Sequence, residues 1–277
     1  MTATLFLVST PIGNLGDFSD RARTAVQSAN LIACEDTRNT KKLIGLLGLE
    51  THADFLSYHE YNADKMRPIL LEKLSQGADI VLVSDAGTPL ISDPGYRLVR
   101  DCLNAGITVV PIPGANAVLP ALQLSGLPSD RFLFAGFLDS KTTARRKELT
   151  ELKSVPATLI FYESPHRVLD TLRDMLAVLG DRQAAVVREL TKRFEESKIG
   201  LISELITFYE QNGEPKGEIV ILADRPAEKA PASFDIHAML VQAMRGKTLR
   251  DAVDEVAAGT GLDRRKIYKE ALEIKNG

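Results

Sequence analysis

The stretch DIVLVSDAGTPLISDPG (79–95) decides the fold of this chain. It opens with an apolar run, DIVLVSD (79–85), of the kind that a strand buried on both faces of a sheet shows. The loop that follows, SDAGTPLISDPG (84–95), holds two aspartates, two glycines and two prolines, which make a rigid turn more elaborate than a connection needs. A buried strand that ends in such a loop is typical of open α/β folds, which bind ligands beyond the carboxyl ends of their strands.

Similar strand-like runs alternate with helix-like segments through the first half of the chain, which predicts βαβ units and a parallel sheet. Ser19 is expected to cap the first helix, and Gly77 and Gly106 stand where helices should stop. The expected strands are residues 4–10, 31–35, 79–85 and 107–113, and the expected helices are residues 19–29, 40–47, 62–76 and 96–105.

The second half predicts another α/β domain and a helical extension. The domain is expected to hold strands at 131–137, 158–164, 183–190 and 218–224 and helices at 115–126, 165–179 and 201–211, in a sheet whose strand directions the pattern does not give. DRPAEKAPAS (224–233) has the composition of a linker. Three short helices follow it, and the last two, separated by GTGLD, resemble a helix-turn-helix pair. The predicted domains are therefore residues 1–115, 116–226 and 233–277.

Composition excludes several classes of protein. With 277 residues and a net charge of −3, the chain can bury a core but has no global positive field, so any nucleic-acid contact must come from local basic patches. Cys34 and Cys102 cannot make a disulfide framework, which favours a reducing, cytoplasmic location. No apolar run is long enough to span a membrane, and no secretory signal is expected. No metal site is expected, because the four histidines are scattered along the chain, at His52, His59, His166 and His237.

Four unusual loops each follow an expected strand, so they should meet at the carboxyl edge of one sheet and form a ligand site. They are STPIGNLGD (9–17), EDTR (35–38), SDAGTPLISDPG (84–95) and PIPGANA (111–117). The first loop lacks both GxGxxG and GxxxxGK[ST], which disfavours a dinucleotide-dependent enzyme and a P-loop hydrolase.

Three of these loops also have a purely structural interpretation. In the first loop, the only role of the proline and glycines can be to form a tight turn. In EDTR, Glu35 or Asp36 can pair with Arg38. In the third loop, Gly87 allows close backbone approach and Asp85 can accept hydrogen bonds from a ribose diol, but Ser92 or Asp93 can equally cap the next helix, with Pro94 as its first residue.

Together with TLIFYESPHR (158–167), these motifs, in this order and spacing, closely resemble the ribosomal small-subunit RNA ribose 2′-O-methyltransferase I family of the tetrapyrrole methylase superfamily. The resemblance covers residues 5–224, and the terminal segment looks like that family's helix-turn-helix extension. Tetrapyrrole-specific enzymes resemble GGDP where this chain has DAGTP, a departure that favours the RNA branch.

The resemblance implies two α/β domains, one with a parallel and one with a mixed sheet, that hold S-adenosylmethionine between them in a homodimer. The implied methyl acceptor is the ribose of a cytidine in the decoding region of small-subunit ribosomal RNA, either free or in the assembled subunit. The implied cofactor-binding positions are Pro11, Asp85, Ala86, Gly87, Ile91, Asn116, Ala117, Tyr162, Glu163 and Gly200.

Methyl transfer to a ribose hydroxyl calls for a base, and basic side chains are needed for RNA. The candidate bases are Glu163, His166, Glu35 and Asp36. The candidate RNA contacts are Lys141, Arg145, Arg146 and Lys147 in KTTARRK, and Arg264 and Arg265 in the terminal helices. These basic runs can instead only solvate a face, and the terminal helices can simply cover the second domain. Two rival interpretations are a superfamily enzyme that methylates a small tetrapyrrole or a protein, and a non-catalytic RNA-binding module.

Overall fold

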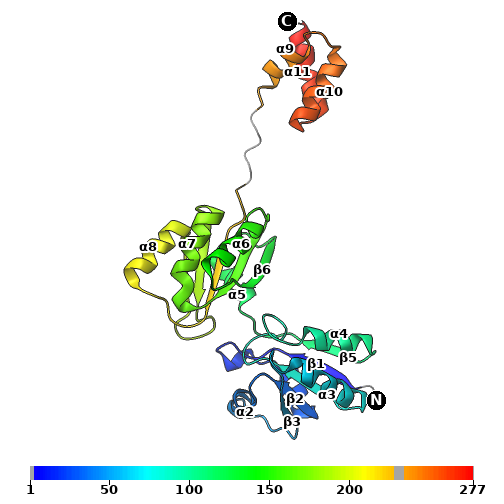
Figure 1. Cartoon of the computed structure of the whole chain (residues 1–277), viewed down its shortest axis with the longest axis vertical. Coiled ribbons are helices and arrows are strands. Elements are labelled where there is room, and N and C mark those ends of the chain that lie inside the picture. Colours follow the sequence, from blue (N-terminus) through cyan, green and yellow to red (C-terminus); the bar gives the residue numbers. More distant parts are fainter. Residues whose placement is uncertain (1–2, 228–233, 277) are drawn as a thin grey trace. The chain divides into compact units, whose positions relative to one another are not determined.

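The computed structural model describes residues 3–227 and 234–276. The chain divides into two compact units, residues 1–226 and 227–277 (Figure 1). The first unit contains two separate five-stranded sheets, and the second contains helices. The predicted fold class, a parallel sheet and a mixed sheet followed by a helical extension, is confirmed.

The first sheet is entirely parallel, with strand order β3-β2-β4-β1-β5. Its central strands are buried on both faces because helices α1 and α2 pack on one side and α3 and α4 on the other. The strands are β1 (Thr4–Val8), β2 (Leu31–Cys34), β3 (Asp54–Ser57), β4 (Ile80–Val83) and β5 (Thr108–Ile112), and the helices are α1 (Asp20–Ser28), α2 (Thr37–Leu46), α3 (Ala63–Ser75) and α4 (Tyr96–Asn104).

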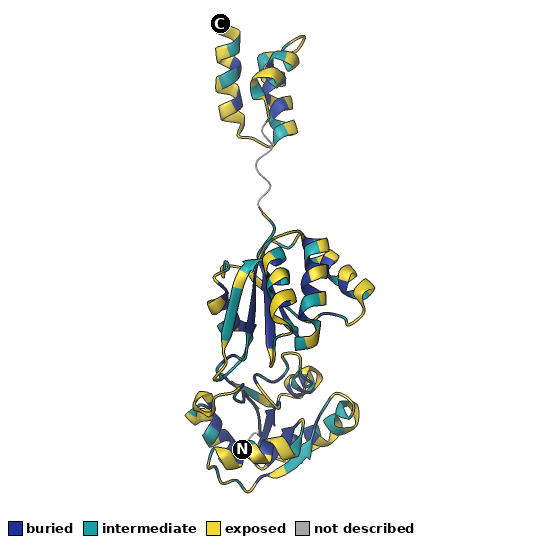
Figure 2. Ribbon diagram, turned by 90° about the vertical axis from the view of Figure 1, so that its left-hand side faces the viewer, coloured by how far each residue is buried: buried dark blue, intermediate teal, exposed yellow. Residues whose placement is uncertain are grey.

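The second sheet is mixed, with order β6-β7-β10-β8-β9, and only β6 and β7 are parallel neighbours. Helices α6, α7 and α8 cover one face and α5 packs on the other. Figure 2 shows buried residues concentrated in the strands and on the helix sides that face them. The strands are β6 (Phe132–Phe137), β7 (Thr158–Glu163), β8 (Gln183–Arg188), β9 (Glu196–Leu201) and β10 (Ile219–Ala223), and the helices are α5 (Val118–Ser125), α6 (Thr142–Leu152), α7 (Val168–Leu179) and α8 (Ile202–Asn212).

The core between α5 and the second sheet also contains Ile12, which belongs to the loop after β1 of the first sheet. Ile12 is 7% exposed and packs with Val118, Leu122 and Val220 in that core. Burying an apolar side chain of this size contributes about 1.5–3 kcal/mol. The first loop therefore anchors to the second sheet as well as to its own.

The sequence pattern did not predict two of the strands and one of the helices. Strands β3 (DFLS) and β9 (ESKIGL) are edge strands of their sheets, so they are only partly buried and show no apolar run. Helix α6 buries only Arg145 and Leu149 along eleven residues, which leaves almost no apolar periodicity to detect. The expected cap is found at Ser19, whose side chain accepts from the Ala22 N–H at 3.2 Å.

In the second unit, helices α9 (Ile236–Ala243), α10 (Leu249–Thr260) and α11 (Arg264–Asn276) enclose a small core. Its buried residues are Leu240, Val253, Val256, Ile267 and Ala271. Asp235 and Thr248 cap the first two helices, and Gly261, at φ +68°, ends α10. Most of the predicted linker, residues 228–233, lies outside the described residues.

Leu98 of α4 is fully buried in the core beside the first sheet, so its substitution tests how α4 is held to that sheet. We predict that Leu98→Ala lowers the free energy of unfolding by about 2–5 kcal/mol, since it leaves a cavity against the sheet. Leu103→Ala is the matched control on the same helix: Leu103 is 61% exposed, so its loss should change stability by no more than about 0.5 kcal/mol. Urea unfolding measures the free energy of unfolding of both variants. An equal loss in the two would contradict the packing of Leu98 against the sheet.

Candidate active site

A cavity of about 400 Å³ lies where loops from both sheets of the first unit meet, a size typical of small-molecule sites. It is bounded by the loops after β1, β4 and β5 of the first sheet and by the ends of β6, β7 and β10 of the second. Its lining residues are Ile12, Ala86, Gly87, Thr88, Ile91, Ser92, Asp93, Asn116, Ala117, Phe137, Tyr162, Glu163, Ser164, Pro165, Gly217, Glu218, Ile219 and Val220.

Hydrogen bonds between loops fix the first-sheet side of this cavity. Thr10 and Gly87 exchange two backbone hydrogen bonds, of 2.8 and 3.0 Å, in an antiparallel bridge. The Thr88 hydroxyl lies 3.0 Å from the Ser9 hydroxyl and donates to the Ala115 carbonyl at 3.1 Å. Three of the four predicted loops are bound to one another by these contacts, and the fourth, EDTR, is bound to the loop after β4 by the Asp36 N–H, which donates to Asp85 at 3.2 Å.

The backbone of the loop after β4 takes conformations that few side chains adopt. Gly87 has φ +85°, and the non-glycine residues Leu90 and Ser92 have φ +74° and +64°. Non-glycine residues in this region cost about 1–3 kcal/mol each and occur mostly at functional sites. The expected cap of α4 by Ser92 or Asp93 is wrong, because α4 begins at Tyr96 with Gly95, at φ +134°, in the cap position.

Seven of the ten implied cofactor positions line the cavity. They are Ala86, Gly87, Ile91, Asn116, Ala117, Tyr162 and Glu163. Tyr162 lies edge-on to Phe137, with ring centroids 5.4 Å apart, and burial raises the pKa of its hydroxyl. These two rings form an aromatic wall on the second-sheet side.

The other three implied positions lie outside the lining. Pro11 precedes the lining residue Ile12. Asp85 accepts from the Asp36 N–H at 3.2 Å and from the Asn39 amide at 2.7 Å, which ties the loop after β4 to α2. Gly200 lies within β9, where a Cβ atom would come 2.8 Å from a carboxylate oxygen of the Glu204 side chain.

Glu163 lines the cavity, but its carboxylate is engaged inside the protein. The residue is 3% exposed, and its two oxygens accept from the Ser164 N–H at 2.7 Å and from the Thr171 hydroxyl at 2.6 Å. Arg167 Nε lies 3.3 Å from one of them. These contacts suit a residue that shapes the loop after β7. His166 is exposed in the 3-10 turn Pro165–Arg167, directly after the lining residue Pro165.

The two candidate bases in EDTR lie outside this cavity. Glu35 is exposed, and Asp36 caps α2 by accepting from the Arg38 N–H at 2.8 Å. Hydrogen bonds from the Arg38 side chain, at 2.7 Å for Nη2, and from its backbone N–H lower the pKa of Asp36 to about 2. Since so acidic a carboxyl is a weak base, Asp36 matches the structural interpretation better than the catalytic one.

Several lining residues were missed from the sequence. Gly217 and Glu218 precede β10, and Ile219 and Val220 begin it. They reach the site because β10 runs antiparallel to β7, a direction that the pattern did not reveal. Phe137 is 57% exposed at the end of β6, an aromatic that could have been noted. Asp93 was considered only as a helix cap. Burial raises the pKa of its carboxyl, nearby Glu35 and Asp85 add to this, and the Ser84 hydroxyl opposes it.

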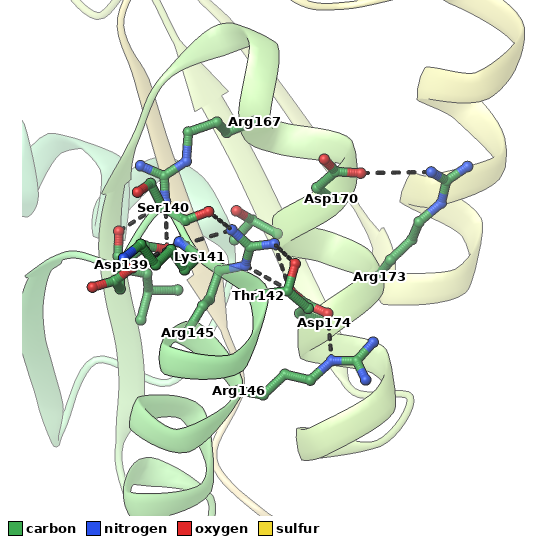
Figure 3. A network of polar contacts seen from close by, with 12 residues as sticks. Asp139, Ser140, Lys141, Thr142, Arg145, Arg146, Arg167, Asp170, Arg173 and Asp174 are labelled. Carbon is green, nitrogen blue, oxygen red and sulfur yellow. Dashed lines mark hydrogen bonds and ion pairs between the residues drawn. The ribbon is translucent and has the colours of Figure 1, made fainter.

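The predicted RNA-contact residues Lys141, Arg145, Arg146 and Lys147 differ sharply in exposure. Figure 3 shows Arg145 and Arg146 both directed toward Asp174. Arg145 is 3% exposed, donates to Asp174 at 2.6 Å and to the Ser140 carbonyl at 3.1 Å, and so forms part of the core. This burial contradicts the expected contact of Arg145 with RNA. Arg146 also pairs with Asp174, at 2.6 Å, but its side chain is 52% exposed. Lys141 and Lys147 are exposed.

In the second unit, Arg264 and Arg265 lie exposed at the start of α11. Arg264 forms an ion pair with Asp254 of α10. Within residues 3–227 and 234–276, no group of three or more His, Cys, Asp and Glu side chains is arranged to hold a metal ion. Across the same residues, none of the helices has the length and apolar character needed to cross a membrane.

A family model described as Tetrapyrrole (Corrin/Porphyrin) Methylases matches residues 4–206, and a second, described as RsmI C-terminal HTH domain, matches residues 230–275. The chain belongs to the tetrapyrrole methylase family. Solved structures of this fold include diphthine synthase, with a TM-score of 0.62 and 15% identity over 80% of this chain and 90% of that one. A cobalt precorrin-4 methyltransferase has a TM-score of 0.59 and 18% identity over 80% and 94% of the two chains.

Closer relatives carry one shared name, Ribosomal RNA small subunit methyltransferase I. The relative from Mesorhizobium japonicum is 46% identical, and the match covers 98% of this chain and 92% of the relative. The relative from Vibrio cholerae is 44% identical over 97% and 94% of the two chains, and the one from Escherichia coli O157:H7 is 43% identical over 97% and 94%. The chain is therefore a member of this branch of the family along nearly its whole length.

The buried pair of Arg145 and Asp174 generates a stability prediction. Asp174→Ala leaves an unpaired guanidinium in the core, so the free energy of unfolding should fall by about 3–5 kcal/mol. Asp170→Ala is the control on the same helix, since Asp170 is 68% exposed and 3.7 Å from Arg173, and it should cost at most about 1 kcal/mol. Denaturant unfolding measures both variants. If they lose the same free energy of unfolding, the contact with Asp174 does not hold Arg145 in the core.

Proposed function

We propose that this chain transfers a methyl group from S-adenosylmethionine to the 2′-oxygen of a cytidine ribose in small-subunit ribosomal RNA. The observation that carries the proposal is the 43–46% identity, over more than nine tenths of both chains, to relatives named Ribosomal RNA small subunit methyltransferase I. A likeness of this extent includes the helical unit at the carboxyl terminus, whereas the tetrapyrrole methylase model ends at residue 206.

The cavity between the two sheets fits S-adenosylmethionine in size and chemistry. Ile12, Ile91 and Val220 offer apolar surface for a flat purine, and the Asn116 side chain is a polar partner in the lining. A sulfonium carries positive charge, which favours aromatic faces and carboxylates, and Phe137, Tyr162 and Glu218 supply both. A uroporphyrin-III C-methyltransferase of the same fold, with a TM-score of 0.54 and 19% identity, was solved with S-adenyl homocysteine.

S-adenosylmethionine, when bound, supplies an electrophilic methyl group on sulfur. The residues of this chain then have to hold the attacking oxygen in line with that methyl, which can provide much of the acceleration. Glu163 contributes to this by fixing the Ser164 N–H at the edge of the cavity. Phe137 and Tyr162 exclude water from the second-sheet side. A base near the cavity has to receive the proton of the ribose hydroxyl.

Contact with RNA is proposed for the exposed basic side chains, because the net charge of −3 supplies no general attraction. These are Lys141, Arg146 and Lys147 on α6 and Arg264 and Arg265 on α11. The homodimer and the cytoplasmic location expected from the sequence remain predictions. The assembled small subunit and the free RNA are both compatible with the proposal.

The proposed activity predicts label transfer at one nucleotide. Purified protein is incubated with methyl-labelled S-adenosylmethionine and small ribosomal subunits from cells that lack the protein, and the methylated position is mapped. We expect label at a single cytidine, resistant to alkaline cleavage because the ribose 2′-oxygen is blocked. Subunits from cells that contain the protein are the control, and they should take up little label because the site is already modified.

Two results would replace this proposal with a rival. Label transfer to a tetrapyrrole or a protein, with none to RNA, would make the chain a small-molecule or protein methyltransferase like the solved structures of its fold. RNA binding without measurable S-adenosylmethionine binding in calorimetry would make it a non-catalytic RNA-binding module.

A further inference from the structure

We propose that a groove beside the cofactor cavity receives the target nucleotide, and that Asp93, which lies where groove and cavity meet, accepts the proton of the ribose hydroxyl. This inference rests on the proposed methyl transfer to ribose. It places on the substrate side of the site a base other than the four that the sequence motifs offered, Glu163, His166, Glu35 and Asp36.

The groove has a volume of about 380 Å³ and lies between the first turns of α3 and α4. Its walls include Tyr58, Asp64, Arg67, Tyr96 and Arg97. Asp93 lines this groove and also the cavity of about 400 Å³ that fits the cofactor, and it is the one lining residue that the two share. An acceptor that enters through the groove therefore meets the cofactor cavity at Asp93.

Asp93 is not the N-cap of α4, the role that its position in the sequence suggested. Gly95 occupies the cap position of α4, so the Asp93 carboxyl is not needed to begin that helix. Its neighbour Ser92 and the nearby Leu90 have φ angles of +64° and +74°. Non-glycine residues adopt such angles only at a cost in conformational free energy, so the surrounding structure must hold this part of the loop in place. Strain of this kind next to a cavity is typical of residues that are positioned for function.

The surroundings of Asp93 suit a proton acceptor. Burial raises the pKa of its carboxyl, and the negative charges of Glu35 and Asp85 raise it further, against a hydrogen bond from Ser84. A carboxylate with a raised pKa is a stronger base than an ordinary aspartate. Asp36, by contrast, is held at a pKa of about 2 by Arg38.

Side chains of the groove, together with Arg100, which packs against the groove residue Tyr96, suit a nucleotide. Tyr96 is 59% exposed, and Arg100 lies 5.4 Å from the centre of its ring, which makes an aromatic and cationic surface for a base. The side chains of Arg97 and Arg100 are 56% and 57% exposed and can contact phosphate. Asp64 pairs with Arg67 at 2.9 Å and with Arg97 at 3.2 Å, and Arg67 also pairs with Asp101 at 2.9 Å. Arg67 is therefore neutralised within the protein, and Arg97 and Arg100 are the guanidiniums proposed to meet a phosphate.

The step balances as follows. The ribose 2′-oxygen forms a bond to the methyl carbon while the bond from that carbon to sulfur breaks, and the electron pair of the broken bond stays on sulfur. The hydroxyl proton passes to the Asp93 carboxylate and then leaves to solvent through the open groove. No oxidant, reductant or metal is required.

The test separates chemistry from binding. In single-turnover transfer to small ribosomal subunits, we expect Asp93→Asn to slow methylation by roughly 10²–10⁴-fold, because the amide cannot accept the proton. Its Kd for S-adenosylmethionine in calorimetry should stay within about threefold of the parent. Asp93→Glu, which restores a carboxylate at a slightly different position, should recover part of the rate. Asp170→Asn, an exposed aspartate of α7, is the matched control and should behave as the parent.

A second variant tests the groove even if Asp93→Asn folds poorly. Tyr96→Ala should raise the KM for small subunits by roughly tenfold with little change in kcat or in S-adenosylmethionine binding, because it removes a stacking surface. Leu103→Ala, an exposed apolar residue of the same helix, is its control.

Three results would overturn the inference while leaving the proposed function intact. The first is a parental rate in Asp93→Asn, above all if His166→Ala abolishes transfer instead. The second is loss of S-adenosylmethionine binding in Asp93→Asn, which would assign the carboxylate to the cofactor. The third is an unchanged KM in Tyr96→Ala. If the parent protein itself transfers no methyl to RNA, the proposed function fails and the inference falls with it.

Discussion

The antiparallel bridge between Thr10 and Gly87 is the contact on which the rest of the site depends. Strands β1 and β4 are parallel neighbours, so the loops that leave them start side by side, and the two backbone hydrogen bonds of the bridge bind those loops together. Gly87 has φ +85°, a backbone conformation that residues with a side chain rarely adopt. A Cβ atom at this position would lie 3.5 Å from Ile12, so the strain of a substitution would come from the backbone angle. Glycine at this position therefore lets one loop close over the other.

From that bridge, the first loop reaches the second sheet. Ile12, two residues after Thr10, is buried in the core beneath α5. The same few residues thus connect the parallel sheet, the loop after β4 and the mixed sheet. The cavity is a consequence, because it lies among these loops and the ends of β6, β7 and β10. A site assembled in this way can bind one ligand through residues from very different parts of the chain.

The sequence predicted the parts of this arrangement that leave a strong local pattern. Buried strands such as β2 and β4 appear as apolar runs, and the glycine- and proline-rich loops mark where they end. Edge strands β3 and β9 were missed because their residues are only partly buried and form no apolar run. The start of β10 was missed as part of the site because strand direction has no local signature.

Individual side chains were harder to predict than loops, because their roles depend on contacts distant in sequence. Arg145 looked like one of four surface cations in KTTARRK, and only Asp174, 29 residues later, explains its burial. Asp93 looked like a helix cap because it precedes a proline, whereas the positive φ angles around it delay the helix to Tyr96. Composition and spacing do not encode such angles, so the proposal of Asp93 as the base rests on the structure.

The central claim is that loops from both sheets hold one cofactor. Hydrogen exchange of the backbone amides, measured by mass spectrometry with and without saturating S-adenosylhomocysteine, tests it most directly. The account predicts slower exchange in residues 84–93, 115–118, 162–167 and 216–220 together, with little change in α9 to α11. Protection confined to one sheet, or concentrated in the terminal helices, would contradict it.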